Sequence, residues 1–232
     1  TLRPKMLSRR YLTAESGFQF TEDILGFLSD KCQDTILDLG CGSGRLIRFL
    51  QRIGKSIIAF DISKWAIQEV RKSYPNVRAF VATTSFVPLV TSSVDMVFCW
   101  RVLHSLSDGQ RRQTFSEIHR VLTPDGVAIF SVASRSDWRI QEYVAKNLAY
   151  QVEPGVYIID EDGRPVIRRF YSQQEIAKEL QPWVEVRELK HISEPSGFAH
   201  RRQNFYWMAL TTKTASAKAA YCQEASCSDG FD

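Results

Sequence analysis

The segment Ile36–Arg45 constrains the fold more than any other part of the 232-residue chain, because an apolar run changes abruptly into a glycine-rich turn. It reads Ile-Leu-Asp-Leu-Gly-Cys-Gly-Ser-Gly-Arg, and the apolar residues behind it are spaced like the buried face of a helix: Leu46, Ile47, Phe49 and Leu50. Glycine is favoured where the backbone turns tightly and approaches a ligand, because a Cβ would clash there. The segment therefore predicts a strand, a turn and a helix of an α/β protein, with a ligand at the turn. A purely structural turn is the alternative.

The spacing of the glycines separates two kinds of nucleotide site. Dinucleotide-binding turns follow the pattern Gly-x-Gly-x-x-Gly. Counted from Gly40, the third glycine of that pattern falls on Arg45, whereas this chain has Gly44. Asp38 stands two residues before Gly40, and a carboxylate there suits a ligand with an amino group, since a nearby cation keeps the acid charged. An NAD-linked oxidoreductase is thus disfavoured.

With Asp38 before it, the turn resembles motif I of the class I S-adenosylmethionine-dependent methyltransferases. The resemblance implies that S-adenosylmethionine is the cofactor and that Asp38 lies near its amino group. It also implies that the turn holds the methionine part through Gly40, Cys41, Gly42 and Gly44.

The resemblance continues along the next two predicted strands. Lys55–Phe60 reads as a buried strand that ends at Asp61, where a carboxylate can accept both ribose hydroxyls, and Ile62 follows it as a further cofactor candidate. A third strand, Val77–Val81, leads into a stretch similar to the family's Asp-Ala-x-x-Leu-Pro-Phe. In it Thr83 replaces an acid that meets the adenine amino group in many relatives, so the adenine candidates are Thr83, Thr84 and Ser85.

The segment after the fourth predicted strand supplies the remaining candidates for the cofactor edge and for catalysis. Trp100 and Arg101 lie where ligands bind at the carboxyl end of an open α/β sheet. His104 has two interpretations: a general base near neutral pH, or a residue packed under the next helix, which we favour. Asp95, at the start of that strand, is expected to be structural.

Matching segments extend from about residue 35 to 132 and imply a Rossmann-like α/β fold. We expect a seven-stranded sheet with its last strand antiparallel and with helices on both faces. The expected organisation is an N-terminal helix or lid (1–30, with Tyr11 as a possible lid residue), a methyltransferase domain (31–213) and a disordered tail (214–232).

Residues 133–171 are predicted as a substrate-covering insert of a helix and a β-hairpin. The helical stretch runs from about Trp138 to Tyr150, and the hairpin strands are 156–159 and 166–170. The residues proposed for an acceptor pocket are Tyr157, Arg168, Arg169 and Tyr171; a solvated hairpin is the alternative.

Composition adds only weak constraints on function. A net charge of +4 is poor evidence for nucleic acid, and no run of eighteen apolar residues suggests a membrane span. Five cysteines at unrelated positions predict neither a disulfide framework nor a metal site, so the chain is expected to be reduced and cytoplasmic.

The sequence therefore predicts methyl transfer to a small-molecule acceptor by in-line displacement. Two alternatives stay open. One is a tRNA methyltransferase of the wobble-uridine type, because the run Ser105–Arg112 is similar to such enzymes. The other is a cofactor-binding scaffold without catalysis, because no base is evident.

Overall fold

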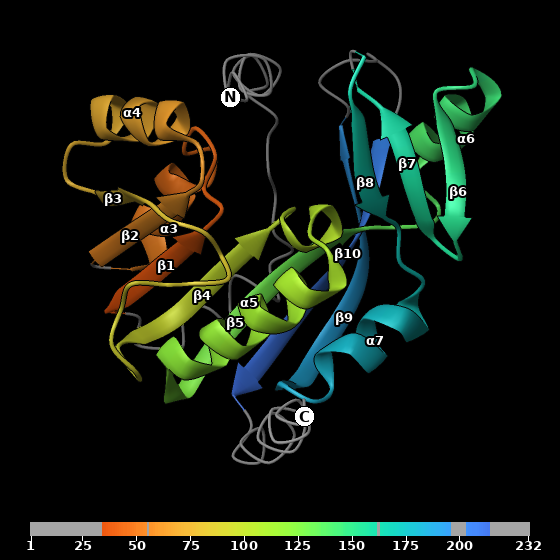
Figure 1. The fold of residues 1–232 in the computed structure, drawn as a ribbon. Coiled ribbons are helices and arrows are strands. Elements are labelled where there is room, and N and C mark those ends of the chain that lie inside the picture. The colour runs from red at the N-terminus through yellow and green to blue at the C-terminus, as the bar shows by residue number, and fades with distance from the viewer. Residues whose placement is uncertain (1–33, 55, 162, 196–202, 214–232) are drawn as a thin grey trace, which may run out of the picture.

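The computed structural model describes residues 34–54, 56–161, 163–195 and 203–213 (Figure 1). In this part of the chain seven strands form one sheet in the order β3-β2-β1-β4-β5-β10-β9. The strands are β1 (Thr35–Leu39), β2 (Ser56–Asp61), β3 (Arg78–Val81), β4 (Val94–Trp100), β5 (Leu122–Ala133), β9 (Val184–Pro195) and β10 (Gln203–Lys213).

Strand direction confirms the predicted topology. Strands β1 to β5 pair in parallel, whereas β10 is antiparallel to both of its neighbours, β5 and β9. Because β1, β2 and β4 are parallel, their carboxyl ends meet at one edge of the sheet, which is where an open α/β sheet binds its ligands.

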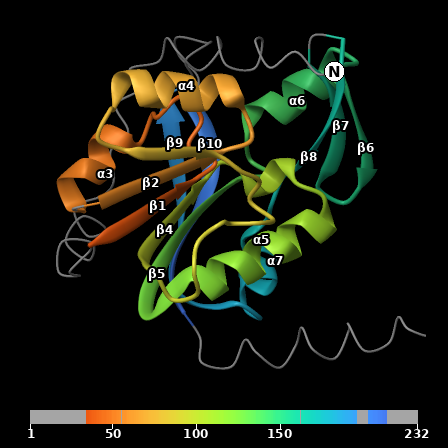
Figure 2. The same ribbon diagram turned by 60° about the vertical axis from the view of Figure 1, so that its left-hand side comes forward.

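Helices cover both faces of the sheet (Figure 2). They are α3 (Ile47–Ile53), α4 (Lys64–Ser73), a 3-10 turn η1 (Leu103–Ser105), α5 (Asp108–Val121), α6 (Trp138–Ala145) and α7 (Gln173–Leu180). Helices α3 and α4 lie on one side of the sheet, and α5 and α7 lie on the other.

Alternation along β1 explains this layering. Successive side chains of a strand point to opposite faces. Ile36 packs in the core below α3 and α4, whereas Leu37 and Leu39 pack against α5 and α7. Asp38 shares the face of Ile36, so a charged group stands among apolar neighbours at the end of a buried strand.

Three helices begin where the sequence places a capping serine. The Ser63 hydroxyl accepts a hydrogen bond from Ala66 N–H at the start of α4. Ser107 at α5 and Ser172 at α7 each form a complete capping box with the residue three positions later. These caps satisfy backbone donors that a helix leaves unpaired.

Strand ends differ from the sequence prediction in two places. The proline and glycine in Thr123–Gly126 predict a turn and a strand that begins at Val127, but β5 begins at Leu122 and includes these residues. The register between β4 and β5 shifts there, so they form an irregularity within the strand. The apolar runs 184–189 and 205–210 predict two short final strands. Strands β9 and β10 are longer because they pair with each other beyond the end of β5, as in the pair Gln203–Pro195.

The chain between β5 and α7 forms a separate small sheet (Figure 1, upper right). After α6, three antiparallel strands follow: β6 (Ala149–Glu153), β7 (Val156–Asp160) and β8 (Pro165–Arg169). The predicted helix to Tyr150 is wrong in its last part. The helix ends at Ala145, Asn147 takes a positive φ of 55°, and the following residues pair with β7.

The two ends of this insert lie side by side. Tyr171 N–H donates to Ala133 O at 2.8 Å, and Arg135 N–H donates to Tyr171 O at 3.0 Å, so the chain leaves and re-enters the main domain at one point. A parallel bridge between Ser134 and Tyr171 closes it.

Candidate functional site

The glycine turn after β1 is held by the end of β2. The N–H groups of Gly40 and Cys41 both donate to Phe60 O, at 2.7 and 2.9 Å. Gly40 has a φ of 83°, and a Cβ added to it would stand 2.3 Å from Cγ2 of Val102. The turn can therefore press against the segment after β4 only with glycine at this position.

The next two glycines serve different purposes. Gly44, with a φ of 91°, packs against the ring of Tyr74, 2.9 Å from an added Cβ. Gly42 also has a positive φ, of 54°, but a Cβ added there meets no described atom within 4 Å. Its side of the turn is open, as a backbone cradle for a ligand would be.

Asp38 lies at the end of β1 with 1% of its surface exposed. Its Oδ2 atom has no hydrogen-bond partner among the described residues. Burial, with a further contribution from the charge of Asp61, raises the pKa of Asp38 to about 7. A buried carboxyl oxygen without a partner is costly, so the position fits a ligand that brings a cationic amino group.

Asp61 connects the second strand to the glycine turn. Its Oδ2 accepts a hydrogen bond from Gly42 N–H and its Oδ1 accepts one from Ser63 N–H, both at 2.8 Å. A carboxylate oxygen can accept more than one hydrogen bond, so ribose hydroxyls still fit. Ile62 beside it is 74% exposed.

The adenine candidates lie on the loop after β3. The hydroxyls of Thr84 and Thr114 are 2.8 Å apart, and the Ser85 hydroxyl lies 3.5 Å from Gln110 O, to which it donates. Both side chains therefore turn toward α5. Thr83 forms an isolated bridge with Phe86, so its backbone conformation is fixed by the loop itself.

Trp100 and Arg101 mark the end of β4. Trp100 is 6% exposed. Arg101 takes a φ of 60°, which is uncommon for a residue with a side chain, and its N–H donates to Ser131 O at 3.1 Å. Its guanidinium lies over the ring of Tyr206, 4.8 Å from the centroid.

His104 lies in η1 and is 9% exposed. Its Nδ1 has no hydrogen-bond partner among the described residues. Burial, followed by the positive charges of Arg168, Arg101 and Arg139, lowers the pKa of His104 well below its usual value. The imidazole is therefore neutral near pH 7, and these surroundings oppose the imidazolium that a general base must form. They favour the structural interpretation.

The predicted acceptor residues of the insert differ in whether they lie near the sheet edge that carries η1. Strand β8 packs against η1, and Arg168 on β8 pairs with Glu161 at 3.1 Å. Arg169 reaches Asp108 at 3.4 Å. Tyr157 packs edge-on against Phe170 within the insert.

One of the predicted acceptor residues, Tyr171, is buried rather than exposed in a pocket. Tyr171 is 1% exposed and belongs to the core beside α5 and α7. Burial raises its pKa, and Trp207 Nε1 donates to its carbonyl oxygen. Tyr11 lies outside the described residues, as do the other parts of 1–30 and the tail.

The sequence analysis missed a polar network at the base of the insert. Asp137 caps α6, is fully buried, and binds Arg139 through both oxygens at 2.7 and 2.8 Å. Arg139 also donates to the Tyr206 hydroxyl at 3.1 Å. The cap Asp137 just after a strand was a usable signal, but nothing in the sequence links Arg139 to Tyr206 on β10.

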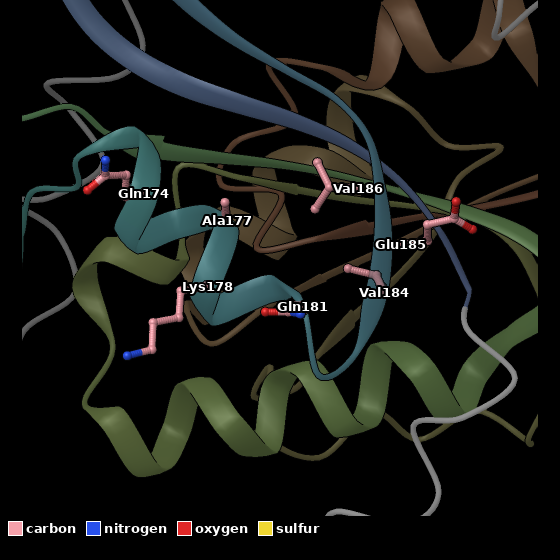
Figure 3. Close-up of a pocket in the computed structure, with 7 residues that line it drawn as sticks. All are labelled: Gln174, Ala177, Lys178, Gln181, Val184, Glu185 and Val186. Carbon is pink, nitrogen blue, oxygen red and sulfur yellow. The ribbon is translucent and has the colours of Figure 1, made fainter.

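A surface pocket of about 600 Å³ lies elsewhere, between α7 and β9 (Figure 3). Val184 and Val186 point from β9 toward the helix, and Ala177 lies opposite them. Since β9 and β5 are both antiparallel to β10, these residues stand at the amino end of the sheet. The pocket is therefore separate from the edge that carries Asp38 and Asp61.

Comparison with known proteins decides which family has this arrangement. The family model described as a methyltransferase domain matches residues 36–126, from β1 into β5. A probable S-adenosylmethionine-dependent methyltransferase of Mycolicibacterium smegmatis is 30% identical over 125 residues, which are 53% of this chain and 48% of that protein. Residues 36–126 therefore form a methyltransferase domain of the S-adenosylmethionine-dependent class. S-adenosylmethionine is the cofactor of such domains, and the buried acid Asp38 and the open side of Gly42 fit it.

Solved structures agree on the fold of this methyltransferase. A methyltransferase from Methanosarcina mazei superposes with a TM-score of 0.71 at 19% identity, covering 84% of this chain and 99% of that one. The 1,6-didemethyltoxoflavin-N1-methyltransferase of Burkholderia thailandensis, solved with 1,6-didemethyltoxoflavin and S-adenosylhomocysteine, gives 0.60 at 20% identity, covering 83% and 74%. The chain spans about half the length of the first curated relatives it matches. Within the described ranges, no helix has the length and apolar character needed to cross a membrane.

Proposed function

We propose that this chain transfers a methyl group from S-adenosylmethionine to a small-molecule acceptor. The observation that carries the proposal is the pair of acids at the carboxyl ends of β1 and β2. Asp38 is buried and its Oδ2 atom has no hydrogen-bond partner among the described residues, and Asp61 is bound to the glycine turn between them. Such a pair matches a ligand with an amino group at one end and a ribose at the other.

Each predicted cofactor residue has a role in this proposal. Asp38 binds the amino group, the turn from Gly40 to Gly44 lies along the methionine part, and Asp61 accepts the ribose hydroxyls. The exposed side chain of Ile62 covers one face of the adenine, and the loop 83–85 meets its edge. Trp100 and Arg101 border the cofactor on the side of β4.

The proposed methyl transfer depends mainly on how the cofactor and the acceptor are positioned. The cofactor supplies a methyl group already activated on a sulfonium, so the chain must hold the acceptor in line and exclude water. Such positioning can lower a barrier by about 7–11 kcal/mol. A site without an evident base is therefore compatible with turnover, and His104 contributes packing in this proposal.

A small-molecule acceptor is supported by the covering insert. Strand β8 packs against η1 directly after the end of β4, and in this proposal the insert covers the acceptor edge, which suits a small molecule better than a polymer. A small molecule is also what the Burkholderia protein binds. We further propose a cytoplasmic location, which the buried free thiols of Cys41 and Cys99 support.

Calorimetric titration with S-adenosylhomocysteine tests the cofactor assignment. Asp38→Asn and Asp61→Asn should each weaken binding by about tenfold or more, the effect of losing a charge-assisted hydrogen bond. Asp125→Asn, at an exposed position on β5, is the matched control and should bind like the wild type. Folded variants of Asp38 and Asp61 with full affinity would refute the assignment, and binding without methyl transfer to any acceptor in a cell extract would favour the scaffold.

A further inference from the structure

Three arginines from three separate elements lie near enough to His104 for their charges to act on it; we call Arg101, Arg139 and Arg168 the arginine cluster. Arg101 follows β4, Arg139 lies in α6, and Arg168 lies in β8. Their charges all act on the His104 imidazole. Convergence of like charges is unfavourable by itself, so the arrangement needs an explanation.

Tyr206 fixes two members of the cluster relative to each other. The guanidinium of Arg101 lies 4.8 Å from the centroid of its ring, and that of Arg139 lies 5.6 Å from it. The ring belongs to β10 and is fully buried. Both cations therefore stand at the boundary between the main sheet and the insert, beside the end of β4.

The members differ in how firmly they are paired. Arg139 is bound through two nitrogens to buried Asp137 at 2.7 and 2.8 Å, so its charge is already paired within the fold. Arg168 meets Glu161 at 3.1 and 3.3 Å, and the Glu161 side chain is 22% exposed. This longer pair at the edge of the insert is one that an incoming anion can replace or share.

His104 supplies a second, independent sign of a ligand. Its side chain is nine-tenths buried, and Nδ1 has no hydrogen-bond partner among the described residues. A neutral imidazole protonated at this atom can donate one hydrogen bond. The cluster therefore offers guanidinium groups and an unused polar atom at one place, the set that recognises planar or tetrahedral oxyanions.

We propose that the acceptor carries a carboxylate or phosphate group that binds between Arg101 and Arg168, beside His104. The inference rests on the proposed function, because it specifies the acceptor of the same site. Arg101 directly follows Trp100 at the end of β4, so an anion held there would anchor the acceptor next to the cofactor edge. Arg168 belongs to the insert, so the insert takes part in selecting the acceptor.

The test uses the protein saturated with S-adenosylhomocysteine and ligand-observed NMR titrations at constant ionic strength. Methyl phosphate and benzoate are the anionic probes, and benzamide is the neutral counterpart of benzoate. We expect saturable binding of at least one anion and none of benzamide; the stronger anion tells a phosphate acceptor from a carboxylate acceptor. Arg168→Gln should weaken that binding by about tenfold or more, and Arg168→Lys should weaken it less.

Arg187→Gln is the matched control, because Arg187 is an exposed arginine on β9 that is likewise paired with a glutamate. It should leave anion binding unchanged, and Arg168→Gln should leave the affinity for S-adenosylhomocysteine unchanged. Absence of anion binding to the cofactor-loaded wild type, equal binding of benzamide, or equal losses in Arg168→Gln and Arg187→Gln would overturn the inference alone. A wild type that does not bind S-adenosylhomocysteine would instead overturn the proposed function, and this inference with it.

Discussion

The carboxylate of Asp61 accepts a hydrogen bond from the backbone N–H of Gly42 at 2.8 Å. The acid that ends the second strand thus sets the conformation of the turn that follows the first, before any ligand is bound. The same carboxylate is proposed to bind ribose, so shaping the turn and binding the cofactor are coupled through one side chain.

Replacing Asp61 by asparagine tests this coupling. One Asp61 oxygen becomes an amide nitrogen, so either Gly42 N–H or Ser63 N–H loses a good acceptor. We expect faster hydrogen exchange at one of these two amides and a loss of about 1–2 kcal/mol in unfolding free energy. Exchange measured by NMR on the ligand-free protein checks this, with Asp125→Asn as control. Unchanged protection at both amides would show that the hydrogen bonds do not hold the turn.

Gly40→Ala should be strongly destabilising. The new Cβ would stand 2.3 Å from Cγ2 of Val102 on a backbone with positive φ, so we expect a loss of about 2–4 kcal/mol from combined strain and overpacking. Urea unfolding measures it. Gly109→Ala is the control, since a Cβ there meets nothing within 4 Å and alanine suits the helix. Adding Val102→Ala should restore part of the loss; if it restores none, the clash is not the cause.

Stability should depend on pH through Asp38. Its pKa is about 7 in the folded chain and about 4 when unfolded. Between these values the folded state holds a proton that the unfolded state has lost, so stability falls as pH rises from about 4 to 7, by up to about 1.4 kcal/mol per pH unit. At a pH above both pKa values, the contribution of Asp38 to stability no longer changes with pH.

Asp38→Asn isolates that contribution. The variant should gain stability relative to the wild type over the same pH range, measured by urea unfolding at several pH values. Binding of S-adenosylhomocysteine, which places a cation beside Asp38 in our proposal, should release protons near pH 6–7 in the wild type only. A difference between the two proteins that does not vary with pH would contradict the raised pKa.

His104 should remain neutral throughout the physiological range. Burial and three arginines lower its pKa well below 6.5, so its imidazole signals should not titrate between about pH 5.5 and 8. Nitrogen-15 NMR of the histidine rings measures this, with assignment from His104→Gln. Removing one arginine by Arg168→Gln should raise the pKa, and a His104 that titrates normally in the wild type would contradict the electrostatic effect of the cluster.

The strand, turn and helix starts at this edge were predictable because their signals are local. Asp38, the glycine turn and the cap Ser63 each act within a few residues of their own position, so their spacing in the chain is also their spacing in space. The insert was less predictable. Asn147 ends the helical stretch through a positive φ, and the residues after it become a strand only because β7 is there to pair with.

Contacts between distant segments account for the remaining differences. Tyr171 looked like a pocket residue beside Arg169, but the chain returns to β5 at this residue, which buries its ring in the core. The link from Arg139 to Tyr206 joins residues 67 positions apart. Neither follows from pattern or spacing.

The neighbouring ends of the insert, joined through Ser134 and Tyr171, make residues 133–171 a module with a single attachment point. A chain segment anchored in this way can lengthen, shorten or be exchanged while β5 and α7 keep their places. With the role that we propose for the insert, acceptor selectivity can therefore diversify in evolution, or in the laboratory, without disturbing Asp38, Asp61 and the glycine turn.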